Sequence, residues 1–406
     1  MHEAHQTIEH VARTAYGRLV AYLSSRTRDV AAAEDALGEA LLEALAAWPK
    51  SGVPDKPEAW LLKAAGHRLL DHQRHLRTRE RHAQALRSMV AEASALEGAD
   101  EYPDERLRLF FVCAHPAIDV AVHAPLMLQV VLGLDAARIA PAFLVSPATM
   151  SQRLVRAKTK IREAGIAFSV PEEHELPQRL ASVLEAIYAA YGLGWDGGQG
   201  PDASARDLAE EAVWLARVLV RRMPDEPEAR GLLALLLFCE SRQQARRTEP
   251  GDYVPLSEQD PARWSEALIR EAELELATAA RSGRPHGRFQ LEAAIQSVHA
   301  DRRRTGRTDW RAVALFYEHI VCLAPTLAAR IGHAVAIGEV QGPEAGLRLL
   351  DRIERASTAS HQPFWAARAH LLARQGRSDE AAQAYDLAIG LAREESVRRF
   401  LMQRRG

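Results

Sequence analysis

The sequence predicts an all-α protein. Apolar residues recur every three or four positions in nearly every segment, which is the spacing of an amphipathic helix. No stretch shows the sustained alternation of apolar and polar residues that marks a half-buried strand. With 406 residues, 47% of them hydrophobic, the chain is long enough for two or three domains with their own cores.

The composition indicates which kinds of function and location to expect for this chain. The 52 basic and 54 acidic side chains give a net charge of −2, so any nucleic-acid contact depends on local clusters of basic residues. Cys113, Cys239 and Cys322 are odd in number and far apart, which favours neither a disulfide framework nor a zinc site. The N-terminus lacks a signal-peptide pattern, and the longest apolar run, residues 232–238, is too short to span a bilayer. We therefore expect a soluble cytoplasmic protein without membrane contact.

The first strongly patterned helix contains AAAEDALGEALLEAL and carries an apolar stripe that reaches Trp48. Pro49 is predicted to end it, and a loop rich in proline and glycine occupies residues 49–57. Pro57 is suited to the first position of the next helix, because proline has no N–H to leave unpaired there.

One face of that next helix is cationic. Lys63, His67, Arg74, Arg77 and Arg81 lie within about 40° of one line at 100° per residue. Such a row can neutralise phosphates, whereas the alternative is a solvated face near an interface. Four histidines lie between residues 67 and 82, but no carboxylate or cysteine completes a ligand set, so no metal site is predicted.

Residues 134–163 predict a short helix, a turn and a longer basic helix, which is the layout of a helix-turn-helix that reads DNA. Ser146 followed by Pro147 predicts the start of the second helix. Along it, one apolar stripe is formed by Met150, Leu154, Ala157 and Ile161. The opposite face is polar and basic. The alternative is an ordinary amphipathic surface helix.

A second boundary is predicted at VPEEHELP, residues 170–177, and a long helical extension follows. Near its end, the spacing of Gly376, Ala381, Tyr385 and Ala388 is typical of a tetratricopeptide-like helical hairpin. A weaker echo lies at residues 342–345. The extension is therefore expected to be built for protein contacts.

Enzymatic motifs are absent from the sequence. GLGWDG, residues 192–197, matches GxGxxG in letters, but it follows a helix-like run instead of a strand, so no phosphate-binding turn is predicted. No nucleophile elbow, HExxH or P-loop occurs. We expect neither catalysis nor a cofactor.

Two basic helical modules joined by a polar linker, with an acidic helix before the first, resemble a bacterial sigma factor of the extracytoplasmic-function (ECF) group over roughly residues 10–168. PEAWLLKAAGHRLLDHQRH resembles the part of region 2 that melts and holds the minus-10 promoter element. DERLRLFFVCAHPAI and the helix-turn-helix after it resemble region 4, which reads the minus-35 element. FLVSPATMSQRLVRAKTKIREAGIAF, LSEQDPARW and LEAAIQSVHA resemble the subgroup with a long tetratricopeptide-like C-terminal extension.

The resemblance implies four parts: a region 2-like part at 1–85, a linker at 86–104, a region 4-like part at 105–169 and the extension at 170–406. Contacts with core RNA polymerase are implied for Glu34, Asp35, Glu39, Leu41 and Leu42. Contacts with the minus-10 element are implied for Lys63, His67, Arg68, Asp71, Arg74 and Arg77. Contacts with the minus-35 element are expected from Thr149, Ser151, Gln152, Arg153, Arg156 and Lys160. A loop at Asp196, Gly197 and Gly198 is implied to help orient the extension.

The expected function is binding of core RNA polymerase and promoter-specific initiation, with the extension modulating activity through regions 2 and 4 or through a protein partner. Two positions depart from the family pattern: Gly38 stands where sigma factors usually carry Gln, and Pro141 lies in the first helix of the helix-turn-helix. They favour an alternative, a degenerate sigma-like adaptor that binds polymerase or a partner without initiating transcription.

Overall fold

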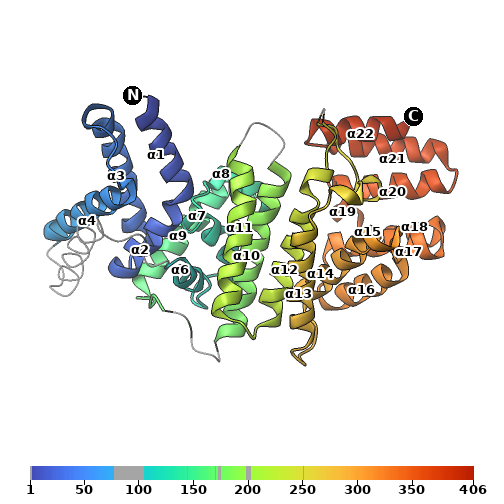
Figure 1. The fold of residues 1–406 in the computed structure, drawn as a ribbon, viewed down its shortest axis with the longest axis horizontal. Helices are drawn as coiled ribbons and strands as arrows, with labels where there is room; N and C mark the ends of the chain where they lie inside the picture. The colour runs from blue at the N-terminus through green and yellow to red at the C-terminus, as the bar shows by residue number, and fades with distance from the viewer. Residues whose placement is uncertain are drawn as a thin grey trace. The chain divides into compact units, whose positions relative to one another are not determined.

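The computed structural model describes residues 2–76, 105–143, 145–169, 171, 175–197, 203–249 and 251–406. In these residues the regular structure is helical (Figure 1), and the one β-type pairing is an isolated bridge between Arg247 and Tyr253. The predicted all-α fold is confirmed. The chain divides into two compact units, residues 1–212 and 213–406.

The first unit begins with four helices, of which three pack against α3. They are α1 (His2–Thr14), α2 (Tyr16–Thr27), α3 (Val30–Ser51) and α4 (Pro57–Leu76). Asp29 caps α3 by accepting a hydrogen bond from the Ala32 N–H at 3.1 Å. Trp48 is buried and meets Trp60 of α4 edge to face, with ring centroids 5.5 Å apart.

The prediction that Pro49 ends α3 is wrong by two residues, because the helix continues to Ser51. A proline in the last turn withholds only its own N–H. The turn is still closed by the Gly52 N–H, which donates to the Trp48 carbonyl at 3.0 Å.

The next helices of this unit are α6 (Arg106–Cys113), α7 (Val120–Val130), α8 (Ala136–Ile139) and α9 (Pro147–Glu163). The predicted start of α9 is confirmed: the Ser146 hydroxyl accepts a hydrogen bond from the Thr149 N–H at 3.2 Å, and Pro147 is the first helical residue. The predicted apolar stripe is also confirmed, since its four members are the buried residues of α9. α8 has a single turn and passes at Ala140 into the 3-10 helix η2 (Ala140–Phe143), which contains Pro141.

Two further helices follow in the chain. α10 (Leu176–Gly197) belongs to the first unit, and α11 (Ala203–Arg222) spans the division at residue 212. α10 packs against α7 and α6. His123 of α7 is buried at this contact, with Nδ1 2.9 Å from the Ser182 hydroxyl and Nε2 3.1 Å from the Ile118 carbonyl. GLGWDG lies within α10, so these glycines do not form a phosphate-binding turn.

The second unit is a succession of helices joined by short turns. The longer ones are α12 (Pro227–Ser241), α13 (Glu266–Ala280), α14 (Arg288–Ala300), α16 (Trp310–Leu323), α17 (Leu327–Gln341), α18 (Pro343–Asp351), α20 (Gln362–Arg374), α21 (Ser378–Leu391) and α22 (Glu395–Arg405). Single-turn pieces are η3 (Gln243–Ala245), η4 (Leu256–Glu258), η5 (Pro261–Arg263), α15 (Arg302–Thr305) and α19 (Arg355–Thr358). Each long helix packs against the one that follows it in this series.

The predicted C-terminal hairpin is formed by α20 and α21. Gly376 turns the chain between them at φ +80°, a conformation that favours glycine. Ala381, Tyr385 and Ala388 are buried against α20. A second hairpin, α17 and α18, turns at Gly342 with φ +96°. The two repeat-like stretches of the sequence, around Gly342 and Gly376, therefore lie in helical hairpins. Their tetratricopeptide character stays a prediction.

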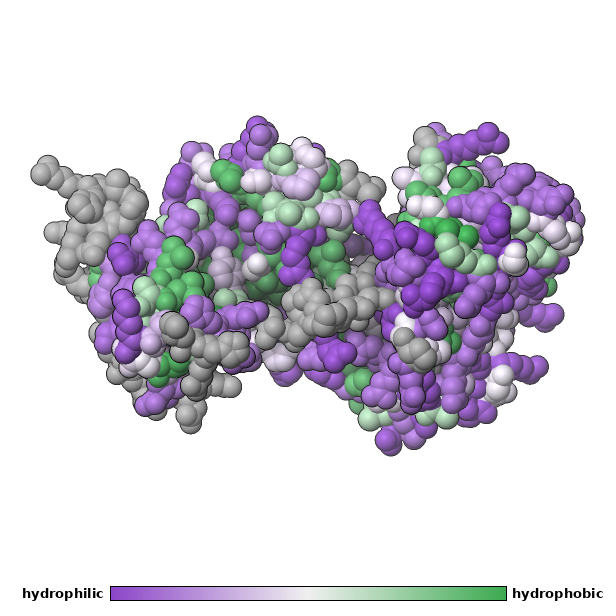
Figure 2. Space-filling model, turned by 90° about the horizontal axis from the view of Figure 1, so that it is seen from above, coloured by the Kyte–Doolittle hydropathy of each residue, from purple (hydrophilic) through white to green (hydrophobic). Residues whose placement is uncertain are grey.

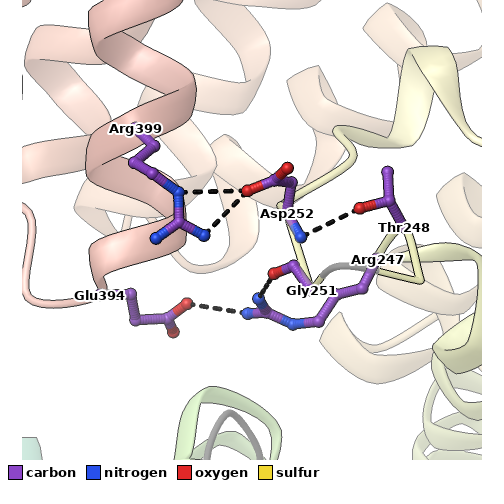
Figure 3. A network of polar contacts seen from close by, with 6 residues as sticks. All are labelled: Arg247, Thr248, Gly251, Asp252, Glu394 and Arg399. Atoms are coloured by element: carbon purple, nitrogen blue, oxygen red, sulfur yellow. Dashed lines mark hydrogen bonds and ion pairs between the residues drawn. The ribbon is translucent and has the colours of Figure 1, made fainter.

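Polar contacts join the C-terminal helix to the loop after η3 (Figure 3). The Arg399 guanidinium donates to the Asp252 carboxylate at 2.8 and 3.1 Å. Arg247 donates to the Gly251 carbonyl at 2.6 Å and lies 3.4 Å from the Glu394 carboxylate. The Arg399–Asp252 and Arg247–Glu394 pairs each connect residues that are 147 positions apart in the chain.

Two stretches that the family resemblance singled out also meet in this unit. Arg302, two residues after LEAAIQSVHA, donates to the carbonyls of Leu256, Ser257 and Gln259 at 2.9, 3.0 and 2.6 Å. All three belong to LSEQDPARW, and the same guanidinium lies 4.9 Å from the Trp264 ring centroid. One arginine thus holds a long loop against the helices.

Hydrophilic residues cover most of the face of the described chain seen in Figure 2, and hydrophobic residues appear there in small patches. None of the described helices combines the length and the apolar composition needed to cross a membrane.

His299 of α14 predicts a pH dependence of stability. Burial, with Arg242 and Arg302 nearby, lowers its pKa to about 4. An unfolded histidine titrates near pH 6.5, so between pH 6.5 and 4 the unfolded chain binds a proton that the folded chain does not. Stability is therefore lost as the pH falls, by about 2 kcal/mol at pH 5 from this residue. Thermal unfolding should show a smaller loss between pH 7 and pH 5 in His299→Gln than in the unsubstituted protein. Equal losses would contradict this assignment.

Candidate nucleic-acid interface

The outer face of α9 carries the residues predicted to read DNA. All six side chains are exposed: Thr149, Ser151, Gln152, Arg153, Arg156 and Lys160. At 100° per residue five of them lie within a sector of about 100° on one side of the buried stripe, whereas Ser151 lies on the other side of that stripe. The structure therefore brings five of the six together and sets Ser151 apart.

The cations of α9 fall into two groups. Lys158 and Arg162 face α3, where Lys158 Nζ lies 2.8 Å from the Glu34 carboxylate and Arg162 lies 3.9 Å from that of Asp29. Arg153, Arg156 and Lys160 have no carboxylate partner among the described residues. Exposed cations that no carboxylate neutralises are available to bind phosphates or the acceptor atoms of guanine.

The acidic helix α3 presents part of its predicted set to solvent. Asp35, Glu39 and Leu42 are exposed and lie within a sector of about 60° on the side opposite the core. Leu42 is 67% exposed, one of several large apolar side chains that the described helices present to solvent. Leu41 is half-buried.

Glu34 is the least exposed acidic member of this set. Its side chain is 11% exposed and lies between Lys158 and the Tyr16 hydroxyl, which is 3.5 Å from Oε1. Burial raises the pKa of Glu34, and the neighbouring Lys158 opposes that shift. The carboxylate is therefore already engaged inside the first unit.

The basic helix α4 lies beside α3. His67 and Arg68 are exposed and Lys63 is half-buried. Arg68 lies 3.0 Å from the Glu43 carboxylate and 3.7 Å from that of Glu39. The predicted minus-10 and polymerase-binding sets thus share one ion-pair network.

Some predicted residues fall outside the described part of the chain. Asp71 and Arg74 lie in α4, but their side chains are not described, and Arg77 lies beyond the described residues. Asp196 and Gly197 end α10, without a described side-chain environment, and Gly198 lies outside. Their predicted roles stay predictions.

Sequence reasoning did not single out Tyr16 and Lys158, which lie against Glu34, or Gly17, where an added Cβ would meet the Val131 carbonyl. Lys158 lies at the edge of the apolar stripe of α9, where the pattern predicts no particular partner. Its carboxylate partner is 124 positions away. Only the packing of α9 against α3 brings the two groups together.

Comparison with known proteins identifies two parts of the chain. Residues 11–81 match sigma-70 region 2, and residues 179–280 match a family of unknown function (DUF6596). An uncharacterised protein of Rhizobium meliloti is 38% identical over 389 residues, which cover 94% of this chain and 90% of that protein.

Shorter similarities connect the chain to characterised relatives. The ECF RNA polymerase sigma factor SigC of Mycobacterium tuberculosis is 40% identical over 70 residues, 17% of this chain and 36% of SigC. The probable RNA polymerase sigma-C factor of Mycobacterium bovis matches to the same extent. No solved structure matches the chain.

Gly38 offers a direct test of the local fold. It lies inside α3, and a Cβ atom there would meet nothing within 4 Å, so packing does not require glycine. We expect Gly38→Ala to raise the free energy of unfolding by about 1 kcal/mol, measured by urea denaturation, because alanine loses less conformational entropy in a helix. Gly52→Ala is the matched control. It also meets open space, but its φ of +87° disfavours alanine, so it should lower stability. The same sign for both variants would contradict this description.

Proposed function

Because the chain belongs to the ECF group of sigma-70 family factors with a C-terminal extension, we propose that it binds core RNA polymerase and directs promoter-specific initiation of transcription. The observation that carries the proposal is the outer face of α9, where three exposed cations have no carboxylate partner among the described residues. We place this activity in the cytoplasm. The family is not one of enzymes, and no catalytic step is proposed.

In this proposal different helices of the first unit contact polymerase and promoter DNA. Asp35, Glu39 and Leu42 of α3 dock on core polymerase, with Leu41 at the edge of the contact. His67 and Arg68, together with Lys63, lie on the helix assigned to the minus-10 element. Arg153 and Arg156 contact phosphates or guanine in the minus-35 element, and Gln152 an adenine edge.

α10 gives the extension a structural part in this activity. Although α10 begins the segment matched to the family of unknown function, it packs on α7 and α6 and closes over His123. We propose that α10 stabilises the region 4-like helices, while the second unit modulates activity by binding a protein partner. The predicted loop residues Asp196 and Gly197 lie at the end of α10, and we assign them, with Gly198, to this regulatory part.

A degenerate adaptor remains the second candidate function. Gly38 weakens the helix assigned to polymerase, and α8 keeps a single turn before Pro141. An adaptor would bind core polymerase without starting transcription at any promoter.

Run-off transcription separates the two functions. With core polymerase and the DNA upstream of its own gene, the protein should produce a discrete start site, and the double variant Arg153→Ala, Arg156→Ala should reduce the product at least tenfold. Arg348→Ala is the matched control, since this exposed arginine of α18 lies in the other unit. Binding to core polymerase without a start site would favour the adaptor, and an undiminished product in the double variant would exclude α9 as the reading helix.

Truncation tests the role of α10. A chain ending at residue 176 loses α10 and should unfold at a clearly lower temperature, because the α7 face around His123 becomes exposed. A chain ending at residue 222 keeps α10 and α11, including the ion pair of buried Arg106 with Glu211, and should retain the stability of the first unit. Circular dichroism melting compares the two. Equal melting temperatures would contradict a stabilising role for α10.

A further inference from the structure

One turn of the second unit is dense in arginine. Residues 302–311, RRRTGRTDWR, contain five arginines, and they join α14 to α16 through the single helical turn of α15 (Figure 1). We call residues 302–311 the arginine turn. The proposed function gives this segment no role.

Hydrogen bonds hold the backbone of the arginine turn. Arg302 points inward, where its guanidinium donates to three loop carbonyls. Gly306 turns the chain at φ +73°, a conformation that favours glycine. The Thr305 hydroxyl donates to the Arg307 carbonyl at 2.8 Å. Asp309 caps α16 by accepting hydrogen bonds from two backbone N–H groups of its first turn at 3.1 and 3.2 Å. The protein itself therefore holds the backbone that presents the other arginines.

Most of the charge of the arginine turn faces solvent. Arg307 and Arg311 are exposed and have no carboxylate partner among the described residues. The Arg304 side chain is 79% exposed and pairs with Asp301 at 3.0 Å. An ion pair so exposed contributes little to stability, so another anion can replace its carboxylate. Arg303 pairs with a carboxylate of α13 at 3.2 Å. At least three arginines of one short turn are therefore available to bind anions.

The composition of the arginine turn favours nucleic acid over protein as its partner. Residues 303–309 are arginine, threonine, glycine and aspartate, so they offer no large apolar side chain to the core of a protein interface. Contacts with phosphates need charge and hydrogen-bond donors, and a guanidinium supplies both in a fork that matches two phosphate oxygens. Duplex DNA carries such phosphates at regular spacing along both strands.

We propose that the arginine turn is a second DNA-binding site, which contacts the phosphates of duplex DNA without reading its sequence. Arg304, Arg307 and Arg311 are its contact residues, and Arg302 holds the turn in place. The site goes beyond the proposed function, because it lies in the second unit and its contacts carry no base information. Since both sites belong to one chain, a contact at the turn strengthens the binding of any DNA that α9 also reaches.

The salt dependence of DNA binding tests the proposal on the full chain. Fluorescence anisotropy measures binding to a labelled duplex of random sequence, and every form carries Arg153→Ala and Arg156→Ala to weaken the contribution of α9. We expect Arg304→Gln, Arg307→Gln and Arg311→Gln together to weaken binding about tenfold at about 50 mM salt. The slope of log affinity against log salt should fall by about 2.7, because each of three phosphate contacts contributes about 0.9.

The matched control removes the same charge elsewhere in the second unit. Arg330→Gln, Arg348→Gln and Arg352→Gln together change three exposed arginines of α17 and α18 and its C-cap, and should leave affinity and slope nearly unchanged. Equal effects of the two triple variants would show that only net charge matters and would overturn the site.

Two further results would overturn the proposal. One is undiminished DNA binding by the variant of the arginine turn, and if that variant instead lost affinity for a polyglutamate peptide, the turn would be a site for acidic protein segments. The other is absence of DNA binding by every form that carries the α9 substitutions. Neither result bears on the proposed function, which run-off transcription with the unsubstituted protein decides. If far-UV circular dichroism shows the triple variant unfolded, Arg307→Gln alone decides the test, with an expected slope change of about 0.9.

Discussion

The largely buried carboxylate of Glu34 couples α9 to α3 within the first unit. A carboxylate that is 11% exposed loses most of its hydration, and it persists there because Lys158 and the Tyr16 hydroxyl replace that hydration. Lys158 can reach it only when α9 lies on α3. The orientation of α9, and with it the direction in which Arg153 and Arg156 point, is therefore coupled to the same charge pair.

α10 contributes a second constraint on the same helices. α7 is held on one side by α2, through the approach of Gly17 to Val131, and on the other by α10, through His123 and Ser182. Burial lowers the pKa of His123, so the ring is held neutral, and the buried ring nitrogens find partners in a hydroxyl and a carbonyl. A segment that belongs in sequence to the extension is thus packed as part of the unit that carries α9. This arrangement couples the first helix of the extension to the helices that carry α9.

Polar side chains fix two loop segments of the second unit. Arg302 binds three carbonyls of one loop, and the preceding loop segment is tied to α22 by the Arg399–Asp252 pair and to its N-cap by the Arg247–Glu394 pair. Such contacts order long irregular segments whose backbone groups cannot pair within a helix.

Much of this protein could be predicted from its residues alone. The buried stripe of α9, its start at Pro147, the start of α4 at Pro57 and the C-terminal hairpin all follow from local rules, because helix periodicity and capping act over three or four residues. The exposed positions of Arg153 and Arg156 follow from the same periodicity. The end of α3 did not follow, because the penalty for Pro49 is small in a final turn. Tertiary structure alone decided that Glu34 is buried, that Lys158 is its partner, that α10 packs on α7 and that Gly17 permits a close approach. Those contacts join residues separated by tens to more than a hundred positions, and a local pattern of apolar and polar residues contains no information about which distant groups meet.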